Sequence, residues 1–222
     1  MRAEIRHADA EPTLVVGLGS GDAITAEAGT LVTVGEGVTM QRPEEGGVLD
    51  SIRKRLSDRT PVRVVRFVAE TAGEVTLAPP LPGEIARIAI PEDPLYVVQA
   101  GSFLAAHDEV DLQSATDGGP TLRGEQLSFL QLRGTGPAFI AGYGAVEERR
   151  LNRGDRLTAD AGHVIAFTGV SHELETVAGL KSAVFEDEGV VSRFRGPGRV
   201  WLQSRSHDAH LAWLQPQLAE LS

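Results

Sequence analysis

The sequence predicts an all-β protein whose body consists of three similar units, followed by a helix at the C-terminal end. Short runs of Val, Ile and Leu alternate with polar residues, which is the pattern of half-buried strands. The 25 Gly and 12 Pro residues of the chain supply turns between those runs. Two different sequence landmarks each occur three times, in alternation, along the chain. This recurrence indicates internal repeats.

The first landmark is an apolar run, an acid or amide, the dipeptide Ala-Gly and a second apolar run. It occupies residues 21–34, 93–105 and 154–167. In the first copy, Ile24, Ala26 and Ala28 alternate with polar neighbours, as residues of a half-buried strand do. Gly29 suits the turn that follows, because glycine adopts a positive φ without strain. Each copy is therefore predicted to be a β-hairpin.

The second landmark is a strand, a glycine turn and another strand, in residues 62–77, 127–143 and 190–203. Its glycines at 73, 136 and 198 are 63 and 62 residues apart, and the Ala-Gly glycines at 29, 101 and 162 are 72 and 61 apart. The two series interleave, so each unit contains two β-hairpins. We place the repeats at about residues 13–92, 93–150 and 151–206, within a single β domain of residues 1–206. Because one hairpin is marginal in water, the units should pack together as a compact prism, barrel or sandwich.

One short helix is predicted inside the first repeat, where the chain is longer than in the other two. Residues 48–56 place four apolar side chains on one helical face, those of Val48, Leu49, Ile52 and Leu56. The basic residues 53–55 lie mostly off this face. They form either a solvated surface or a contact with anionic lipid.

A second helix is predicted in the tail, because leucines recur at helical spacing at positions 211, 214, 218 and 221. Ser206 or Asp208 is the expected N-cap, and Pro216 is expected to kink or divide the helix. We expect residues 207–222 to pack on the β body or on a partner subunit.

Composition excludes several classes of function. The chain has no cysteine, which excludes disulfides, thiolate catalysis and cysteine-ligated metal sites. Its net charge of −10 leaves no uniform basic field, so we expect no nucleic-acid partner. No stretch approaches the ~20 apolar residues of a membrane span, and residues 1–6 contain no apolar signal core. We expect a soluble cytoplasmic protein, with peripheral membrane association left open.

One local patch combines basic and aromatic residues. Its members are Arg193, Arg195, Arg199, Trp201 and Arg205. Arginine and tryptophan together are suited to an anionic ligand, to RNA or to an acidic subunit. The alternative interpretation is that these arginines pair with the excess carboxylates of the chain itself.

Metal and catalytic sites are weakly indicated. His163 and His172 lack the His-x-His pair of metal-binding β folds, so turn or surface histidines are the favoured interpretation. His207 and His210 are three residues apart in the tail but form a poor ligand set. The repeat-equivalent oxygen groups of Glu27, Gln99 and Asp160 could converge on a cation; capping of the following turn is the favoured alternative. We predict no metal, no cofactor and no catalytic residues.

Several segments resemble the altered-inheritance-of-mitochondria family, number twenty-four. They comprise residues 26–32, 77–79, 82–85, 101–105, 141–144, 160–163 and 194–206. The resemblance extends from about residue 12 to the C-terminal helix. It implies a double-stranded β-helix-like fold of three β units, related to the subunit of the tryptophan RNA-binding attenuation protein. It implies no established enzymatic activity, and its bacterial members are cytosolic proteins of uncharacterised function.

The function expected from the sequence is that of a non-catalytic scaffold or protein-interaction protein. The partner is expected to be a second copy of the chain or another protein. The alternative is a module that binds a small molecule, a sugar or an anionic ligand in a cleft between repeats.

Overall fold

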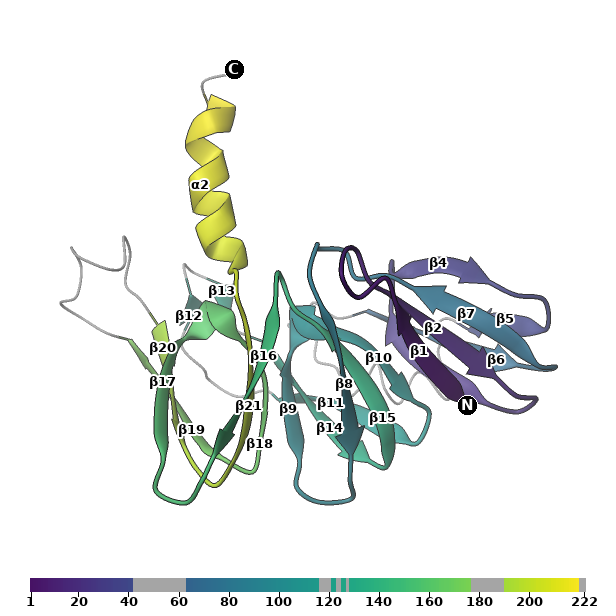
Figure 1. The fold of residues 1–222 in the computed structure, drawn as a ribbon, viewed down its shortest axis with the longest axis horizontal. Helices are drawn as coiled ribbons and strands as arrows, with labels where there is room; N and C mark the ends of the chain where they lie inside the picture. The colour runs from purple at the N-terminus through teal and green to yellow at the C-terminus, as the bar shows by residue number, and fades with distance from the viewer. Residues whose placement is uncertain (42–62, 116–120, 123–124, 127, 177–189, 220–222) are drawn as a thin grey trace.

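The chain folds into antiparallel β-sheets with a helix after the last strand (Figure 1). The structure is a computed structural model that describes residues 1–41, 63–115, 121–122, 125–126, 128–176 and 190–219. The predicted all-β class with a C-terminal helix is confirmed. The helix predicted at residues 48–56 lies outside the described residues.

In the part of the chain that the structure describes, the body consists of three units of six strands. The first contains β2 (Thr13–Leu18), β3 (Ala23–Glu27), β4 (Leu31–Val34), β5 (Val38–Gln41), β6 (Val64–Ala69) and β7 (Gly73–Leu77). The second contains β8 (Ile85–Ile90), β9 (Tyr96–Gln99), β10 (Phe103–His107), β11 (Val110–Ala115), β14 (Phe129–Gly134) and β15 (Gly136–Ala141). The third contains β16 (Val146–Leu151), β17 (Arg156–Asp160), β18 (Val164–Thr168), β19 (Ser171–Thr176), β20 (Val190–Arg195) and β21 (Gly198–Gln203).

The other described elements lie outside the six-stranded pattern of these units. They are β1 (Arg2–Arg6), the small pair β12 (Thr121–Leu122) and β13 (Glu125–Gln126), the 3-10 turns η1 (Ala100–Ser102) and η2 (Ala161–His163), and the helix α2 (His207–Ala219). Strand β1 pairs with β2 and extends the first unit at its outer edge.

The same pairing scheme occurs in all three units. The sixth strand of each unit pairs with the first and the third, and the fifth pairs with the second and the fourth. Each unit is therefore built from two three-stranded sheets, and the chain passes repeatedly from one to the other. Pairing also places β8 with β15 and β16 with β21. The unit boundaries consequently fall near residues 78–84 and 142–145, earlier than the predicted positions at 92 and 150.

The hairpins predicted from the sequence differ from the observed pairing. Strands β3 and β4 lie in different sheets, and so do β6 and β7. Gly29 does take a positive φ of 99° at the turn between β3 and β4. A glycine turn of this kind joins two strands equally well within a sheet or between two facing sheets. The local pattern therefore locates the strands and leaves their partners undetermined.

Neighbouring units are joined by shared sheets. Pairing of β3 with β10 creates a six-stranded first shared sheet, in the order β5-β6-β3-β10-β15-β8. Pairing of β9 with β18 creates the second shared sheet, in the order β11-β14-β9-β18-β21-β16. The N-terminal sheet (β1-β2-β7-β4) and the C-terminal sheet (β17-β20-β19) lie at the two ends. Figure 1 shows the units in an open row. Of the three expected forms, prism, barrel and sandwich, the packing of facing sheets corresponds to the sandwich.

A separate hydrophobic core fills each unit. The first contains Leu14, Phe67 and Leu77, the second contains Leu112, Leu132 and Ile140, and the third contains Phe129, Phe167 and Phe194. Each core lies between two consecutive sheets of the row. The two shared sheets therefore contribute side chains to a core on each face, as the alternating direction of strand side chains allows.

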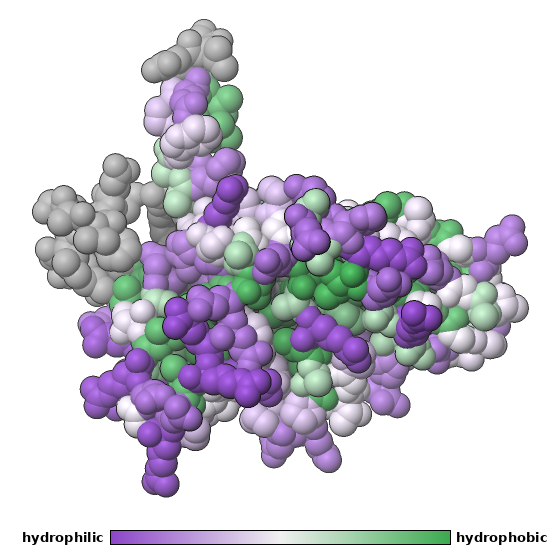
Figure 2. Space-filling model, in the orientation of Figure 1, coloured by the Kyte–Doolittle hydropathy of each residue, from purple (hydrophilic) through white to green (hydrophobic). Residues whose placement is uncertain are grey.

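Helix α2 begins after Ser206, one of the two predicted N-caps, whose Oγ accepts a hydrogen bond from the Ala209 amide at 3.2 Å. The helix continues through Pro216. It stands clear of the β body, with apolar side chains on its surface (Figure 2), which differs from the expected packing on the body. Its beginning meets the body where the His207 ring stacks on Tyr143 at 5.7 Å. Within the described residues, no helix is long and apolar enough to cross a membrane.

Replacing Leu112 with Ala should lower the free energy of unfolding by about 2–5 kcal/mol, because the substitution leaves a cavity in the second core. Met40 provides a matched control. It occupies the same position of the fourth strand as Leu112, opposite Phe67 as Leu112 is opposite Leu132, but it is exposed. Met40→Ala should change the stability by less than about 0.5 kcal/mol. Urea titration checks both, and equal losses would contradict the assignment of the cores.

Candidate interaction site

The basic and aromatic residues singled out in the sequence lie in three separate places. Arg193 and Arg195 are exposed on β20, in the C-terminal sheet. Arg199 and Trp201 lie on β21, in the second shared sheet. Arg205 lies beyond the end of β21. Since a strand rises about 3.3 Å per residue, the span from Arg199 to the end of β21 alone is about 13 Å. The five side chains do not form one continuous patch.

Trp201 is part of the second core rather than an open stacking surface. Its side chain is only 3% exposed, and its ring lies 5.8 Å from that of Tyr96. The Arg199 guanidinium lies 5.5 Å from the Trp201 ring and donates a hydrogen bond to the Tyr96 hydroxyl at 3.0 Å. This cation–π contact fixes Arg199 over the core edge. Arg199 is therefore committed to contacts within the chain.

Arg205 lies in the short connection between β21 and helix α2. Its guanidinium lies 5.5 Å from the ring of Tyr143. The rings of His207 and His210 also contact Tyr143, each at 5.7 Å, and Trp213 follows His210 at 5.9 Å. The contacts of His207 and His210 with Tyr143 connect the first turn of the helix to the body. The side chain of Trp213 itself is 61% exposed.

Arg193 and Arg195 face solvent at the C-terminal end of the row. Arg193 Nε lies 2.6 Å from Glu175 Oε2, and both side chains are about half exposed. An exposed ion pair of this kind contributes only about 0–1 kcal/mol, so it is easily exchanged for another. Arg195 lies directly opposite Arg156 on the neighbouring strand β17. At this end of the molecule, Arg156 and Arg195 are therefore adjacent on β17 and β20, and Glu173 on β19 lies opposite Arg193.

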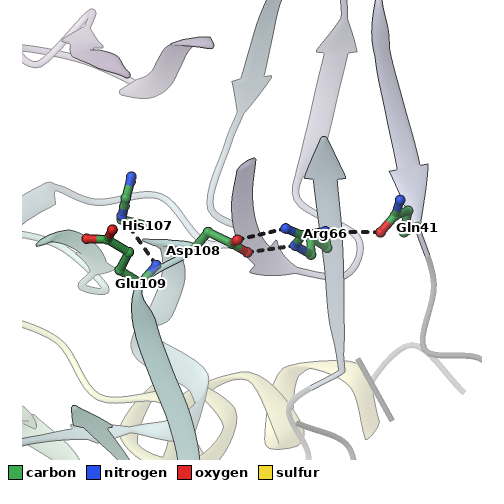
Figure 3. A network of polar contacts seen from close by, with 5 residues as sticks. All are labelled: Gln41, Arg66, His107, Asp108 and Glu109. Atoms are coloured by element: carbon green, nitrogen blue, oxygen red, sulfur yellow. Dashed lines mark hydrogen bonds and ion pairs between the residues drawn. The ribbon is translucent and has the colours of Figure 1, made fainter. Parts of the chain in front are cut away.

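A polar network that the sequence pattern does not predict lies at the junction of the first two units (Figure 3). Arg66 on β6 donates to both carboxylate oxygens of Asp108, from Nε at 2.6 Å and from Nη2 at 2.7 Å. Arg66 Nη1 also donates to Gln41 on β5 at 3.2 Å. The bond from Arg66 lowers the pKa of Asp108 and raises that of Arg66. Since Arg66 belongs to the first unit and Asp108 to the second, this bidentate pair connects the units.

The two histidines considered as metal ligands are each satisfied by a different partner. His163 Nδ1 lies 2.8 Å from the Gln203 carbonyl oxygen. His172 lies among the rings of Phe167 and Phe194, and its Nε2 lies 3.2 Å from Ser192 Oγ. Burial in this aromatic surrounding lowers the pKa of His172 to about 4. Among the described side chains, no group of three or more His, Asp or Glu residues is placed to hold a metal ion.

The three repeat-equivalent oxygen groups lie on three different sheets. Asp160 Oδ1 accepts a hydrogen bond from the Gly162 amide at 2.8 Å, which confirms the turn-capping interpretation for this residue. Gln99 precedes η1 without a side-chain cap. Glu27 is half-buried, and this burial raises the pKa of its carboxyl group to about 7. The three groups therefore have different surroundings and no common ligand position.

Comparison with known proteins identifies the family. The family profile described as mitochondrial biogenesis AIM24 matches residues 3–205. The chain belongs to the AIM24 family. The family resemblance seen in the sequence is thereby confirmed.

This AIM24-family chain is also similar to two proteins of Streptococcus pyogenes. One, an uncharacterized protein of a serotype M6 strain, is 24% identical over 214 residues, which is 92% of this chain and 86% of the relative. The other is known from a crystal structure. It superposes on this chain with a TM-score of 0.81 at 22% sequence identity, and the superposition covers 97% of this chain and 99% of the other. The second similarity establishes a shared fold for the AIM24-family chain.

His172 and Glu27 should give this AIM24-family protein two opposing pH dependences. The folded pKa of His172 is about 4, below its ordinary 6.5, so stability is lost as the pH falls from 6.5 towards 4. The folded pKa of Glu27 is about 7, above its ordinary 4.5, so stability is lost as the pH rises from 4.5 towards 7. Between pH 4.5 and 6.5 the two slopes oppose each other, each amounting to at most about 1.4 kcal/mol per pH unit.

Single substitutions should expose each slope. In His172→Gln, the free energy of unfolding should decrease with rising pH more steeply than in the parent. In Glu27→Gln, it should increase with rising pH. Urea titrations from pH 4.5 to 7.5 measure both slopes. Only the slope is compared, so a general loss of stability in either variant does not affect the result. Slopes that equal the parent's would contradict the burial of these groups.

Proposed function

We propose that this protein is a non-catalytic scaffold that acts through contacts with other protein chains. The observation that carries this proposal is the position of its exposed apolar side chains. Among the described residues, the large exposed apolar side chains other than Met1 occupy two regions. Val32, Val34 and Met40 lie at the N-terminal end of the row, and Leu211, Trp213 and Leu218 lie on helix α2. Apolar groups concentrated in this way are typical of protein-interaction surfaces.

The chemistry of the described polar residues supports the same proposal. Their hydrogen bonds connect strands, turns and units, as Arg66 does with Asp108. Each of the candidate residues Arg193, Arg199 and Arg205 contacts another side chain of the chain itself. The described residues thus contain groups that hold the architecture together, and we propose no reaction for them. The cytoplasmic location expected from the sequence is part of this proposal.

An anionic ligand is a second candidate, favoured by one feature. Arg156 and Arg195 are exposed and lie opposite each other on β17 and β20, where like charges are unfavourable. A small anion between the two guanidinium groups would relieve this repulsion.

In cells, a photo-crosslinking amino acid at Val32 or Leu211 should form adducts with protein, because both side chains are exposed in the two apolar regions. The adduct can contain another copy of the chain or a different protein. The same amino acid at Arg153, an exposed turn position between β16 and β17, is the control and should give none. Gel analysis and mass spectrometry identify the adducts. The scaffold proposal fails if all three positions give the same result.

Inorganic phosphate tests the second candidate. It should raise the melting temperature relative to chloride at equal ionic strength, because a ligand that binds only the folded state stabilises it. The increase should disappear in Arg195→Gln and persist in Arg153→Gln. An equal increase in both variants would exclude a site between Arg156 and Arg195.

A further inference from the structure

The two ends of the row each present one half of the contact that joins the units. Inside the row, the third strand of one unit pairs with the second strand of the preceding unit, as β10 does with β3 and β18 with β9. At the N-terminal end, the corresponding third strand is β4, which pairs among the described strands only with β7. At the C-terminal end, the corresponding second strand is β17, which pairs only with β20 in the same described set.

Strand β4 exposes side chains whose counterparts are buried. A register shift occurs at the start of each third strand, between Leu31 and Thr33, Phe103 and Ala105, and Val164 and Ala166, and it aligns the three strands. Val32 therefore corresponds to Leu104 and Ile165. Leu104 is 1% exposed and Ile165 is 0% exposed, whereas Val32 is 54% exposed. Edge strands of isolated proteins are commonly protected by charged residues, and the sequence of β4, LVTV, contains none.

Strand β17 shows the same difference at the other end. Thr158 on β17 lies opposite Arg193, and its counterpart Thr25 on β3 lies opposite Arg66. Thr25, which lies opposite Ala106 of β10, is only 2% exposed, whereas Thr158 is exposed. Both ends thus lack, among the described strands, a neighbour that every internal junction has.

We propose that a second copy of this chain occupies both edges, with β4 of one copy adding to β17 of the next. The inference deepens the proposed scaffold function and rests on it. Joining the C-terminal sheet to the N-terminal sheet would make a sheet with the same central pairing as the two shared sheets. Because the two contact surfaces differ, the contact is head-to-tail and repeats, so it produces a closed ring or an open filament.

The internal junctions give the register of the new one. In the first junction Ala105 lies opposite Ala26 and Ala106 opposite Thr25. In the second, Ala166 lies opposite Val98 and Phe167 opposite Val97. The same register, applied to β4 and β17 at the open ends, places Thr33 of one copy opposite Ala159 of the next. It places Val34 opposite Thr158.

The charges at the two ends complement each other in this register. At the first junction, Arg66 reaches Asp108, which directly follows β10 and its last residue, His107. At the second junction, both charges are missing, because Gln131 occupies the arginine position and Gly169 the acid position. At the open ends, Arg193 occupies the arginine position. In the first unit, Gly35 corresponds to His107, so the next residue, the exposed Glu36, corresponds to Asp108. In the assembly, Arg193 would exchange its exposed ion pair with Glu175 for Glu36 of the next copy, so an arginine and an acid that fit each other are divided between the two ends.

Cysteine pairing tests the register, since the natural chain contains no cysteine. Thr33→Cys and Ala159→Cys proteins, mixed and mildly oxidised, should form a disulfide-linked dimer containing one of each. Val34→Cys with Thr158→Cys should do the same. Opposed residues on antiparallel strands have Cα atoms about 4.5–5.5 Å apart, within the range of a disulfide. Glu4→Cys on the other edge of the N-terminal sheet, mixed with Ala159→Cys, is the mismatched control and should remain unlinked.

The same proteins distinguish other modes of association. Thr33→Cys alone should give no linked dimer; a dimer of Thr33→Cys with itself would show symmetric pairing of two β4 strands and overturn the proposal. A chain that carries both Thr33→Cys and Ala159→Cys should yield a ladder of covalent multimers or one closed species.

Light scattering as a function of concentration tests the charges without oxidation. Glu36→Arg should raise the concentration at half-assembly by about tenfold or more, because the introduced guanidinium would face that of Arg193. The double variant Glu36→Arg with Arg193→Glu should recover most of this loss. Trp213→Ser on helix α2 and Glu4→Arg on β1 are the matched controls and should assemble like the parent.

Failure of this inference is distinguishable from failure of the scaffold proposal. A parent protein that stays monomeric up to about millimolar concentration, the range in which the weakest specific contacts form, would overturn head-to-tail assembly. If the Val32 photo-crosslink then joins a different protein, the scaffold proposal stands and this inference falls. Disulfide dimers between Thr33→Cys and Ala159→Cys, with none from Glu4→Cys, support both.

Discussion

Pairing between strands of neighbouring units is the interaction on which the rest of the structure depends. Each three-stranded sheet is small, and the hydrogen bonds between β3 and β10 and between β9 and β18 join such sheets into two six-stranded ones. A sheet shared by two units forms one wall of two cores. The position of each core therefore depends on the sheet that lies between it and the neighbouring core. The row also has two different ends, because the second strand of one unit always pairs with the third strand of the next.

Polar side chains stabilise one of the two junctions between units. Strand pairing itself places no requirement on side-chain charge, but the Arg66–Asp108 pair adds two charge-assisted hydrogen bonds across the first junction. At the second junction the corresponding residues are Gln131 and Gly169, and the aromatic contact of Tyr96 with Trp201 lies nearby in the core. A junction can thus be completed by an ion pair or by apolar packing, and the sequence uses both.

The sequence predicts most strand positions but not which strands pair with each other. The alternation around Ile24 and the turn at Gly29 located β3 and the start of β4, because alternation and positive φ are local properties. Whether β3 pairs with β4 or with β10 depends on contacts made about eighty residues apart, which local patterns do not record. For the same reason, the residues around Trp201 form one group in the sequence, where only proximity along the chain is visible. The fold separates them, because Trp201 turns into the core and Arg205 lies between β21 and helix α2, against Tyr143.

The sequence by itself determined the all-β class, the threefold recurrence of its landmarks, the C-terminal helix and the membership of the AIM24 family. These follow from periodicity, glycine placement and motif order, which are properties of short segments. Only the tertiary structure decided that the chain alternates between facing sheets, that Arg66 meets Asp108, and that β4 and β17 are left as free edges among the described strands. Each of these depends on which distant strands come together, and burial and charge pairing acquire their meaning only once those partners are known.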